Sequence, residues 1–252
     1  MGKDWVLWSE EELVGFDLET TGADVSSDSI VSFALVTFEG PEPTRTLTSL
    51  VDPGQPITPE AEAVHGISQE TAREMGMELG KAVSTIVDTL IDASERSVPV
   101  VGMNVCFDLT IVDTLANRIF GAGLLERGFA APVLDVLVLD RHVDKYRKGS
   151  RRLSSLCEHY GVTQKDAHEA NDDVRSCVDV LRVMAQRFPE IGAADPAVLS
   201  QNQVLWHHEW ATEYSRWRVQ QGKPALHPRE LRWPLMREDI ALAKPTQLSL
   251  AI

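Results

Sequence analysis

The chain has 252 residues, of which 43% are hydrophobic, and it carries a formal net charge of −14. This length and composition fit one substantial domain with a smaller extension, and no run approaches the roughly 18 consecutive apolar residues that a membrane-spanning helix needs. The acidic balance by itself disfavours a nucleic acid partner, because Lys and Arg supply most of the free energy of phosphate binding.

The amino-terminal residues and the cysteines bear on the cellular compartment. Residues 1–12 contain three glutamates and two tryptophans instead of the basic and then apolar segments of a secretion signal. Cys106, Cys157 and Cys177 are sparse and lack C-x-x-C spacing, which argues against a disulfide framework and against a structural zinc site. We therefore expect a cytoplasmic protein without a membrane partner.

Strand patterns dominate the first part of the chain. Residues 13–19 form a short apolar stretch that stops at the turn-forming residues 20–22, and residues 30–38 are its expected hairpin partner. A third strand ends at the strong turn signal of residues 52–54. The expected strands are residues 13–19, 30–38, 45–51, 98–103 and 133–138.

Apolar residues at helical spacing lie between and after these strands. The expected helices are residues 59–64, 68–74, 81–93, 107–120, 153–160, 169–188 and 197–221, and one that continues from the last strand to Val143. Strands that come first and then alternate with helices predict an α/β domain with a mixed sheet. We divide the chain into a main domain at residues 1–190, a linker and tryptophan-rich helix at residues 191–221, and an extended tail at residues 222–252.

Three carboxylates stand out by their position in the chain. Two lie in an apolar strand, where a charge is unfavourable, and the third lies at a junction where a site is expected. Asp17 and Glu19 are two residues apart on one predicted strand, so their side chains share a face of the sheet. A carboxylate in an otherwise apolar strand is unfavourable unless a cation pairs with it. Asp108 follows the strand at residues 98–103, at the kind of strand-to-helix junction where sites of α/β folds lie.

His168 and Asp173 are five residues apart at the start of the long helix predicted at residues 169–188, close enough to face one cleft. Converging carboxylates are what a pair of Mg²⁺ or Mn²⁺ ions requires. Two such ions, roughly 3.5–4 Å apart, can activate a water molecule and stabilise the leaving 3′ oxygen of a phosphodiester. A histidine with an ordinary pKa of about 6.5 can accept the proton of that water.

Three motifs occur in one order: residues 16–22 (FDLETTG), 104–108 (NVCFD) and 168–173 (HEANDD). Together they resemble the DEDD exonucleases, in the subtype whose general base is histidine, a family that includes the proofreading subunit of bacterial replicative polymerase. Residues 59–67 (PEAEAVHGI) are another stretch typical of the proofreading branch, and the resemblance covers residues 12–188. It implies a ribonuclease H-like fold, with a mixed five-stranded sheet flanked by helices and a C-terminal helical extension and tail.

The resemblance also implies roles for individual residues. The implied ligands of two divalent ions, Mg²⁺ or Mn²⁺, are Asp17, Glu19, Asp108 and Asp173, and the implied general base is His168. The residues implied to contact the terminal nucleotide or to line its cleft are Leu18, Thr20, Thr21, Asn104 and Phe107.

Residues 141–152 contain six Lys or Arg and one Asp, a local surplus of positive charge. Such a stretch is a solvated helix face in most proteins, but here it would emerge near the third motif. We therefore favour phosphate contacts for four of its residues, Arg147, Lys148, Arg151 and Arg152.

Other polar and aromatic residues have a structural interpretation. We expect His65 to orient its loop. Residues 207–209 (HHE) lack the H-E-x-x-H spacing that places two histidines on one helix face, so we expect no metal there. The tryptophans of residues 197–221 are expected to pack against the domain or a partner rather than to stack on bases.

The motifs favour a 3′→5′ exonuclease acting on DNA in proofreading or repair, with single-stranded DNA as the favoured substrate. An RNase of the same fold, which trims RNA 3′ ends or short oligoribonucleotides, is an alternative, because the sequence does not indicate how the cleft treats a 2′-hydroxyl. A second alternative is a polymerase- or clamp-associated binding module with little catalysis. The complete set of carboxylates and the histidine argue against this module.

The chain ends with residues 247–252 (QLSLAI), which resemble the short Gln- and Leu-rich peptides with which bacterial polymerases and repair enzymes bind the sliding clamp. Gln247 would be held by polar contacts, while Leu248, Leu250 and Ile252 would fill apolar pockets. The alternatives are that these side chains pack onto the domain or that the match is accidental. A clamp would raise the effective concentration of an acidic enzyme at DNA.

Overall fold

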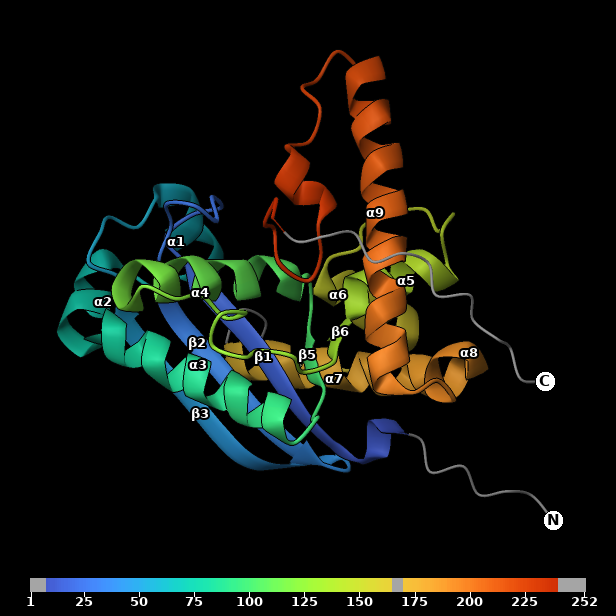
Figure 1. Cartoon of the computed structure of the whole chain (residues 1–252), viewed down its shortest axis with the longest axis horizontal. Coiled ribbons are helices and arrows are strands. Elements are labelled where there is room, and N and C mark those ends of the chain that lie inside the picture. The colour runs from blue at the N-terminus through green and yellow to red at the C-terminus, as the bar shows by residue number, and fades with distance from the viewer. Residues whose placement is uncertain (1–7, 165–169, 240–252) are drawn as a thin grey trace.

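The computed structural model describes residues 8–164 and 170–239, arranged as Figure 1 shows. Its centre is a six-stranded mixed sheet in the order β4-β3-β2-β1-β5-β6. The strands are β1 (Glu12–Thr20), β2 (Ile30–Glu39), β3 (Glu42–Asp52), β4 (Met77–Glu78), β5 (Val100–Gly102) and β6 (Val133–Asp135). Antiparallel pairing joins β1, β2 and β3, whereas β5 on β1, β6 on β5 and β4 on β3 are parallel. The expected α/β class and mixed sheet are confirmed.

The sheet has one strand more than the five expected. The additional strand, β4, consists of two residues that pair with Val51 and Asp52 of β3 at the sheet edge. Two residues are too few to show an alternating pattern, so the sequence carried no signal for this strand. In addition, β6 ends at Asp135 and not at residue 138, because the Asp135 side chain accepts a hydrogen bond from the Leu137 N–H at 2.9 Å and caps the next helix.

The helices are α1 (Pro59–His65), α2 (Gln69–Met75), α3 (Leu79–Glu95), α4 (Val105–Phe120), α5 (Val136–Val143), α6 (Leu153–Tyr160), α7 (Ala170–Arg187), α8 (Pro189–Gly192) and α9 (Pro196–Gln220). One face of the sheet is covered by α3 and α4, and the opposite face by α7 (Figure 1). The short helix α8 extends into the start of the segment expected to be a linker, at residues 191 and 192. Among the described helices, none is long and apolar enough to cross a bilayer.

Alternation along β1 decides which side of the sheet each side chain faces. Phe16 and Leu18 belong to the core with α3 and α4, whereas Leu13 belongs to the core with α7. Gly15 also faces α7, where its nearest neighbour is Val174. Because side chains two residues apart share a face, Asp17 and Glu19 continue this α7 side of β1.

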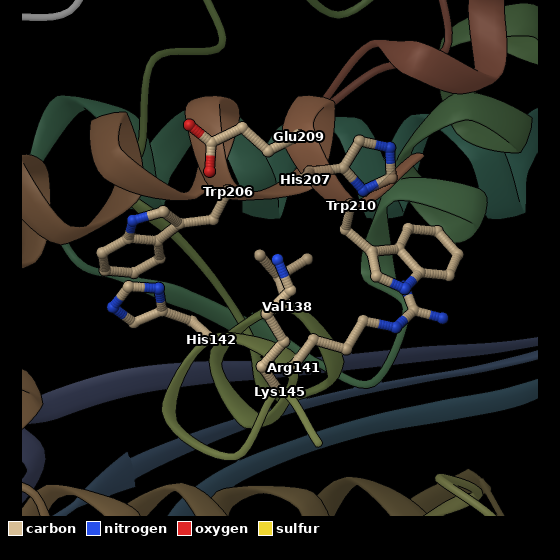
Figure 2. A pocket seen from close by; sticks show the side chains of 8 residues that line it. All are labelled: Val138, Arg141, His142, Lys145, Trp206, His207, Glu209 and Trp210. Carbon is tan, nitrogen blue, oxygen red and sulfur yellow. The ribbon is translucent and has the colours of Figure 1, made fainter. Parts of the chain in front are cut away.

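The first half of α9 is fixed to β6 and α5. Gln203 Oε1 accepts a hydrogen bond from the Asp135 N–H at 2.8 Å, and Gln203 Nε2 donates to the Val133 carbonyl at 2.8 Å. One turn further along, the Trp206 ring stacks on His142 of α5 with the ring centroids 3.6 Å apart (Figure 2).

Residues 222–239 differ from the extended tail expected from residue 222 onward. They return along α9 through the short helix η2 (Pro228–Leu231) and then pack against α4. Trp233 and Leu235 are 1% and 0% exposed, and the Met236 N–H donates to Thr110 Oγ1 of α4 at 2.9 Å. Scattered prolines in this segment interrupt any helical period, so the sequence did not indicate that these residues belong to the core.

Candidate active site

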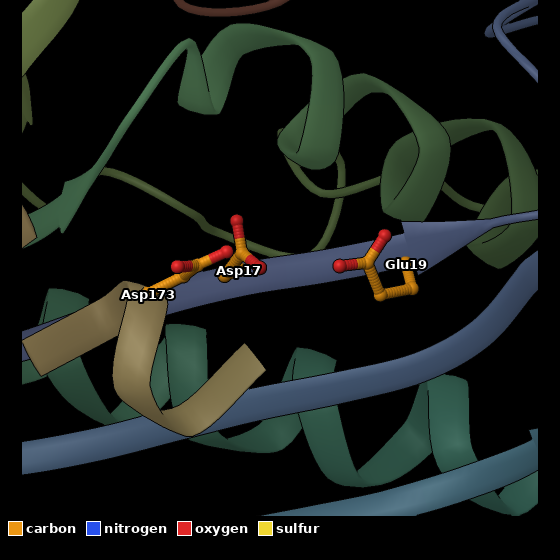
Figure 3. A group of neighbouring side chains, drawn as sticks. All are labelled: Asp17, Glu19 and Asp173. Atoms are coloured by element: carbon orange, nitrogen blue, oxygen red, sulfur yellow. The ribbon is translucent and has the colours of Figure 1, made fainter. Parts of the chain in front are cut away.

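Three carboxylates meet where β1 faces the first turn of α7. One oxygen from each of Asp17, Glu19 and Asp173 lies within 4.8 Å of the others, and Figure 3 shows the two β1 side chains beside Asp173. Among the described residues, Gln164 Nε2 also donates a hydrogen bond to Asp173 Oδ1 at 2.7 Å. Side chains that are distant in sequence thus form one acidic cluster.

A glycine lets α7 approach β1 closely enough to form this cluster. A Cβ atom on Gly15 would lie 2.3 Å from Val174 Cγ1, the residue that follows Asp173. No ordinary side chain fits at that distance, so residue 15 must lack a Cβ if α7 is to keep its position.

Asp108 adds a fourth carboxylate from the first turn of α4. Its side chain is 5% exposed, and its Oδ1 accepts a hydrogen bond from the Leu18 N–H at 3.1 Å. This bond ties α4 to β1 at the residue between Asp17 and Glu19. The start of α4 is fixed from the other side by Asn104, which has a φ of 60° and donates its N–H to buried Asp135 at 2.9 Å.

The carboxylates of the cluster oppose one another's ionisation. Burial, followed by the charges of the neighbouring carboxylates, raises the pKa of Asp17 well above its usual value. Burial and then Asp173 raise the pKa of Glu19 to about 7. Burial also raises the pKa of Asp108 well above its usual value. A divalent cation would relieve this repulsion, and an all-oxygen set of this kind suits Mg²⁺ or Mn²⁺.

A pocket of about 320 Å³ adjoins the cluster. Three of the residues named from the sequence line it, namely Glu19, Thr20 and Phe107. The lining also includes residues from α1 and its flanks that were given no substrate role: Thr58, Glu60, Ala61, Val64 and His65. The signal that could have found them is the stretch at residues 59–67, which resembles the proofreading branch.

His65 orients its loop and also lines the pocket. Its Nδ1 accepts a hydrogen bond from the Ile67 N–H at 3.0 Å, as expected for a residue that orients the loop. The side chain is nevertheless part of the pocket lining, and burial lowers the pKa of its imidazole. A neutral imidazole at this position can contact a substrate without adding charge.

Three predicted substrate contacts do not line this pocket. The Leu18 side chain lies in the core with α3 and α4. Thr21 is 0% exposed and donates its hydroxyl to Asp28 Oδ1 at 2.7 Å, so it holds the loop after β1. Asn104 caps α4. These residues support the elements that carry the carboxylates and Phe107.

The basic stretch divides into internal and external cations. Arg147 Nη2 lies 3.0 Å from Asp140 Oδ2, and Arg151 pairs with the same carboxylate, which is 0% exposed. Tyr160 also donates its hydroxyl to Asp140 Oδ1 at 2.9 Å. Both arginines therefore neutralise a buried charge. Lys148 and Arg152 are exposed, and phosphate contact by these residues stays a prediction.

His168, the predicted general base, and Gln247, Leu248, Leu250 and Ile252 of the predicted clamp peptide lie outside the described residues. His207 and His208 lie within them. Their ring nitrogens are 3.0 Å and 3.2 Å from the carbonyl oxygens of Glu230 and Leu231, so they hold the returning segment, in agreement with the structural interpretation.

A mixed α/β sheet whose central strand carries carboxylates, joined by others from the first turns of two helices, is the architecture of a carboxylate-based nuclease. Comparison with known proteins specifies the family. The chain belongs to the exonuclease family RNase_T, whose model matches residues 14–181.

Relatives of this chain include replicative polymerase chains and a polymerase subunit. The PolC-type DNA polymerase III of Caldanaerobacter subterraneus subsp. tengcongensis is 26% identical over 200 residues, which make up 79% of this chain and 13% of that protein. The DNA polymerase III subunit epsilon of Treponema pallidum is 24% identical over 186 residues, 72% of this chain and 80% of that protein.

Similar solved structures include exonucleases I. The E. coli enzyme in complex with a dA16 oligonucleotide has a TM-score of 0.63 and 19% identity, over 73% of this chain and 42% of that chain. The enzyme from Methylocaldum szegediense has a TM-score of 0.61 and 23% identity, over 79% of this chain and 45% of that chain. At these identities the likeness shows the shared fold.

Proposed function

We propose that this chain is a 3′→5′ exonuclease that hydrolyses DNA from a free 3′ end, with single strands as its favoured substrate. The observation that carries the proposal is the group of Asp17, Glu19 and Asp173 oxygens within 4.8 Å of one another, beside a pocket that Glu19 helps to line. Membership of the exonuclease family and the fold shared with an exonuclease I bound to dA16 support it.

Four carboxylates, Asp17, Glu19, Asp108 and Asp173, would hold two divalent ions, Mg²⁺ or Mn²⁺. When bound, such ions supply Lewis-acid activation of the attacking water and stabilise the charge on the leaving oxygen. The chain contributes ligands that are fixed before the metal arrives. Gly15 sets the approach of α7, and the bond from the Leu18 N–H orients Asp108.

We assign the general base to His168, five residues before Asp173. Its imidazole would accept the proton of the attacking water, a role for which histidine is suited at neutral pH. The pocket beside Glu19 would hold the terminal nucleotide, with the Phe107 ring and the Val64 and His65 side chains as its walls.

We further propose a role in proofreading or repair, with a DNA polymerase or a sliding clamp as partner. The similarity to a polymerase III epsilon subunit supports a polymerase connection. Residues 247–252 resemble a clamp-binding peptide, and residues 1–190 form the proposed catalytic domain. Deletion of residues 247–252 should leave hydrolysis of free oligonucleotides unchanged and abolish capture of the chain by its host clamp. Equal capture of both forms, or of neither, would remove the clamp proposal.

The activity is tested with one single-stranded DNA, labelled at its 5′ end and prepared with either a free or a blocked 3′ end. The wild-type chain with Mg²⁺ should shorten only the free strand, one nucleotide at a time, and EDTA should stop the reaction. Asp17→Asn should be inactive, whereas Glu95→Gln, which removes an exposed carboxylate on α3, should be fully active.

The same assay separates the alternatives. Faster shortening of the RNA strand of identical sequence would identify an RNase. Binding of the strand without any shortening would identify a binding module. Internal cleavage of the blocked strand would contradict an exonuclease.

A further inference from the structure

A row of stacked aromatic side chains follows α9 away from the sheet. Trp210, Tyr214 and Trp217 lie at helical spacing on one face, with ring centroids 5.1 Å and 5.6 Å apart and interplanar angles of 14° and 16°. Trp206, one turn earlier, continues the row inward to His142. We call Trp210, Tyr214 and Trp217 the α9 ladder.

Each ring of the α9 ladder has its own cation. The Arg141 guanidinium carbon lies 3.3 Å from the centroid of Trp210, as Figure 2 shows at the junction of α5 and α9. Arg218 lies 5.8 Å from the centroid of Tyr214, and the Lys223 ammonium lies 5.8 Å from that of Trp217. Rings paired in this way hold positive charge along one line of the surface.

The outer end of the α9 ladder is open to solvent. Trp217 and Val219 are 47% and 56% exposed. In Figure 1 the outer end of α9, beyond its contacts with α5, stands clear of the sheet, with the returning segment beside it. Trp217 therefore presents part of its ring to solvent, where a ligand can contact it.

The charge around this outer end is positive in an acidic chain. Residues 214–224 (YSRWRVQQGKP) contain three Lys or Arg and no Asp or Glu, whereas the whole chain has a net charge of −14. The inner end borders Lys145, which pairs with Glu213 at 3.1 Å. A polyanion is therefore the complementary partner, and aromatic rings between cations are the composition of single-strand nucleic acid surfaces.

The segment of α9 just before this row is joined to the candidate active site through hydrogen bonds from backbone N–H groups to side-chain acceptors. Gln203, one turn before Trp206, accepts from the Asp135 N–H at 2.8 Å. The Asp135 carboxylate in turn accepts from the Asn104 N–H at 2.9 Å, at the start of the helix that carries Asp108. The base of α9, about two turns before Trp210, is thus tied to the helix that carries Asp108, and the α9 ladder leads outward from this base.

We propose that the α9 ladder and the cations on it form a second binding surface for single-stranded nucleic acid, which holds the strand upstream of the 3′ end. This inference rests on the proposed nuclease function and extends it from the terminal nucleotide to the following nucleotides. Phosphates contact the cations along the row, and bases contact the exposed ring of Trp217 and its neighbours. The consequence is a dependence of affinity on strand length.

The test compares strands of about 3, 8 and 16 nucleotides, spanning the roughly 4–16 nucleotides that single-strand sites cover. Binding of labelled oligo-dT to the full chain is measured by fluorescence anisotropy in EDTA, and hydrolysis is measured separately with Mg²⁺. Tyr214→Leu with Trp217→Leu removes two rings and keeps apolar area and helix propensity. Phe120→Leu is the matched control, because Phe120 is also exposed and also has a cation, Arg127, over its ring at 4.9 Å.

A second variant tests the charges alone. Arg216→Gln with Lys223→Gln removes two cations of the outer end, while Arg218 is kept because its Nε donates to the Pro224 carbonyl at 2.9 Å. The slope of log Kd against log salt should fall by about 0.7 for each phosphate that the variant no longer neutralises.

The ring variant should raise the Kd for the longest strand roughly tenfold or more and leave hydrolysis of the shortest strand unchanged. Equal affinity of wild type and ring variant for the longest strand would overturn the proposal. An equal loss of affinity on all three strands would also overturn it, because such a loss marks a structural role of the rings. A wild-type Kd that does not depend on strand length would overturn it as well and would assign this face to a protein partner. Failure of the nuclease proposal is distinguishable from these outcomes, because the wild type would then hydrolyse none of the strands.

Discussion

Gly15 of β1 and Val174 of α7 are so close that a Cβ on residue 15 would lie 2.3 Å from Val174 Cγ1. Because Val174 follows Asp173, this single approach sets how far the α7 carboxylate lies from Asp17 and Glu19. The geometry of the acidic cluster thus depends on a residue that has no side chain.

Gly15→Ala should push α7 away from β1 and separate Asp173 from the β1 carboxylates. We expect kcat/KM to fall by about 100-fold, the usual effect of a displacement of about 1 Å in a catalytic group, with a loss of roughly 1–3 kcal/mol of stability from overpacking. Adding Val174→Ala should restore much of the activity. Gly80→Ala, whose Cβ would meet only the flexible Glu78 carboxylate at 3.1 Å, is the control. Full activity of the single variant would refute this role of Gly15.

Asp17 and Asp108 should differ in stability although both are needed for activity. Asp17→Asn removes a charge that its neighbours repel, so the metal-free variant should melt at a higher temperature than the wild type. Asp108→Ala leaves the buried Leu18 N–H without its acceptor and should cost about 1–3 kcal/mol. Both should retain less than about a few per cent of the activity, since an oxygen ligand is removed. Thermal melts in EDTA and the oligonucleotide assay measure the two effects, and melting shifts of the same sign would contradict the distinction.

The metal-free chain should lose stability as pH rises from about 4.5 to about 7. The folded-state pKa of Glu19, raised to about 7 from 4.5, means that the folded state binds more protons than the unfolded state in this window. The contribution of Glu19 to the stability of the fold is fully present below its unfolded-state pKa. It is lost as pH rises through the folded-state pKa, and the loss is about 3 kcal/mol at most. Melts of wild type and Glu19→Gln in EDTA across this range provide the check, because the variant should have a shallower slope. Mn²⁺ should stabilise the wild type more at pH 8 than at pH 5, since metal and protons compete for the same oxygens.

His168→Ala should lower the hydrolysis rate by roughly 10²–10⁴-fold, the usual contribution of a general base. Strand affinity should change little, because the imidazole acts on the water and not on the strand. The deficit should shrink at high pH, where hydroxide replaces the missing base. A near-normal rate of the variant at neutral pH would exclude the histidine as the base.

The two kinds of cation in residues 141–152 should respond in opposite ways. Arg147→Gln with Arg151→Gln leaves the buried Asp140 charge without its ion pairs, and we expect a loss of about 3 kcal/mol or more. Lys148→Gln with Arg152→Gln should leave the melting temperature unchanged. The slope of log Kd against log salt for strand binding should fall by about 0.7 for each phosphate left without its cation. An unchanged salt slope would show that the exposed pair is only a solvated surface.

The part of the site that depends on local spacing could be predicted from the sequence. Alternation along β1 places Asp17 and Glu19 on one face, and the start of the long helix brings Asp173 to them. The strand and helix pattern likewise predicted the α/β class. Local spacing cannot tell, however, that Thr21 points into its own loop at Asp28, because that depends on a contact formed by the fold.

Roles that depend on which groups the folded chain buries escaped prediction for the same reason. Arg147 and Arg151 belong to a basic run in the sequence, and local spacing does not show that Asp140, directly before this run, is fully buried and pairs with both. The pocket lining from α1 and the core position of Trp233 also follow from packing and not from periodicity.

The burial of Trp233 and Leu235 against α4 has a consequence for how the chain acquires its fold. The bond from Met236 to Thr110 spans 126 residues, so the core on this side of the sheet closes only when the returning segment arrives. Contacts of such long sequence separation form slowly, and a chain made from its amino terminus at about 5–20 residues per second exposes the α4 surface until residue 235 has emerged. The core around α4 is therefore complete only after residues 233–236 have emerged.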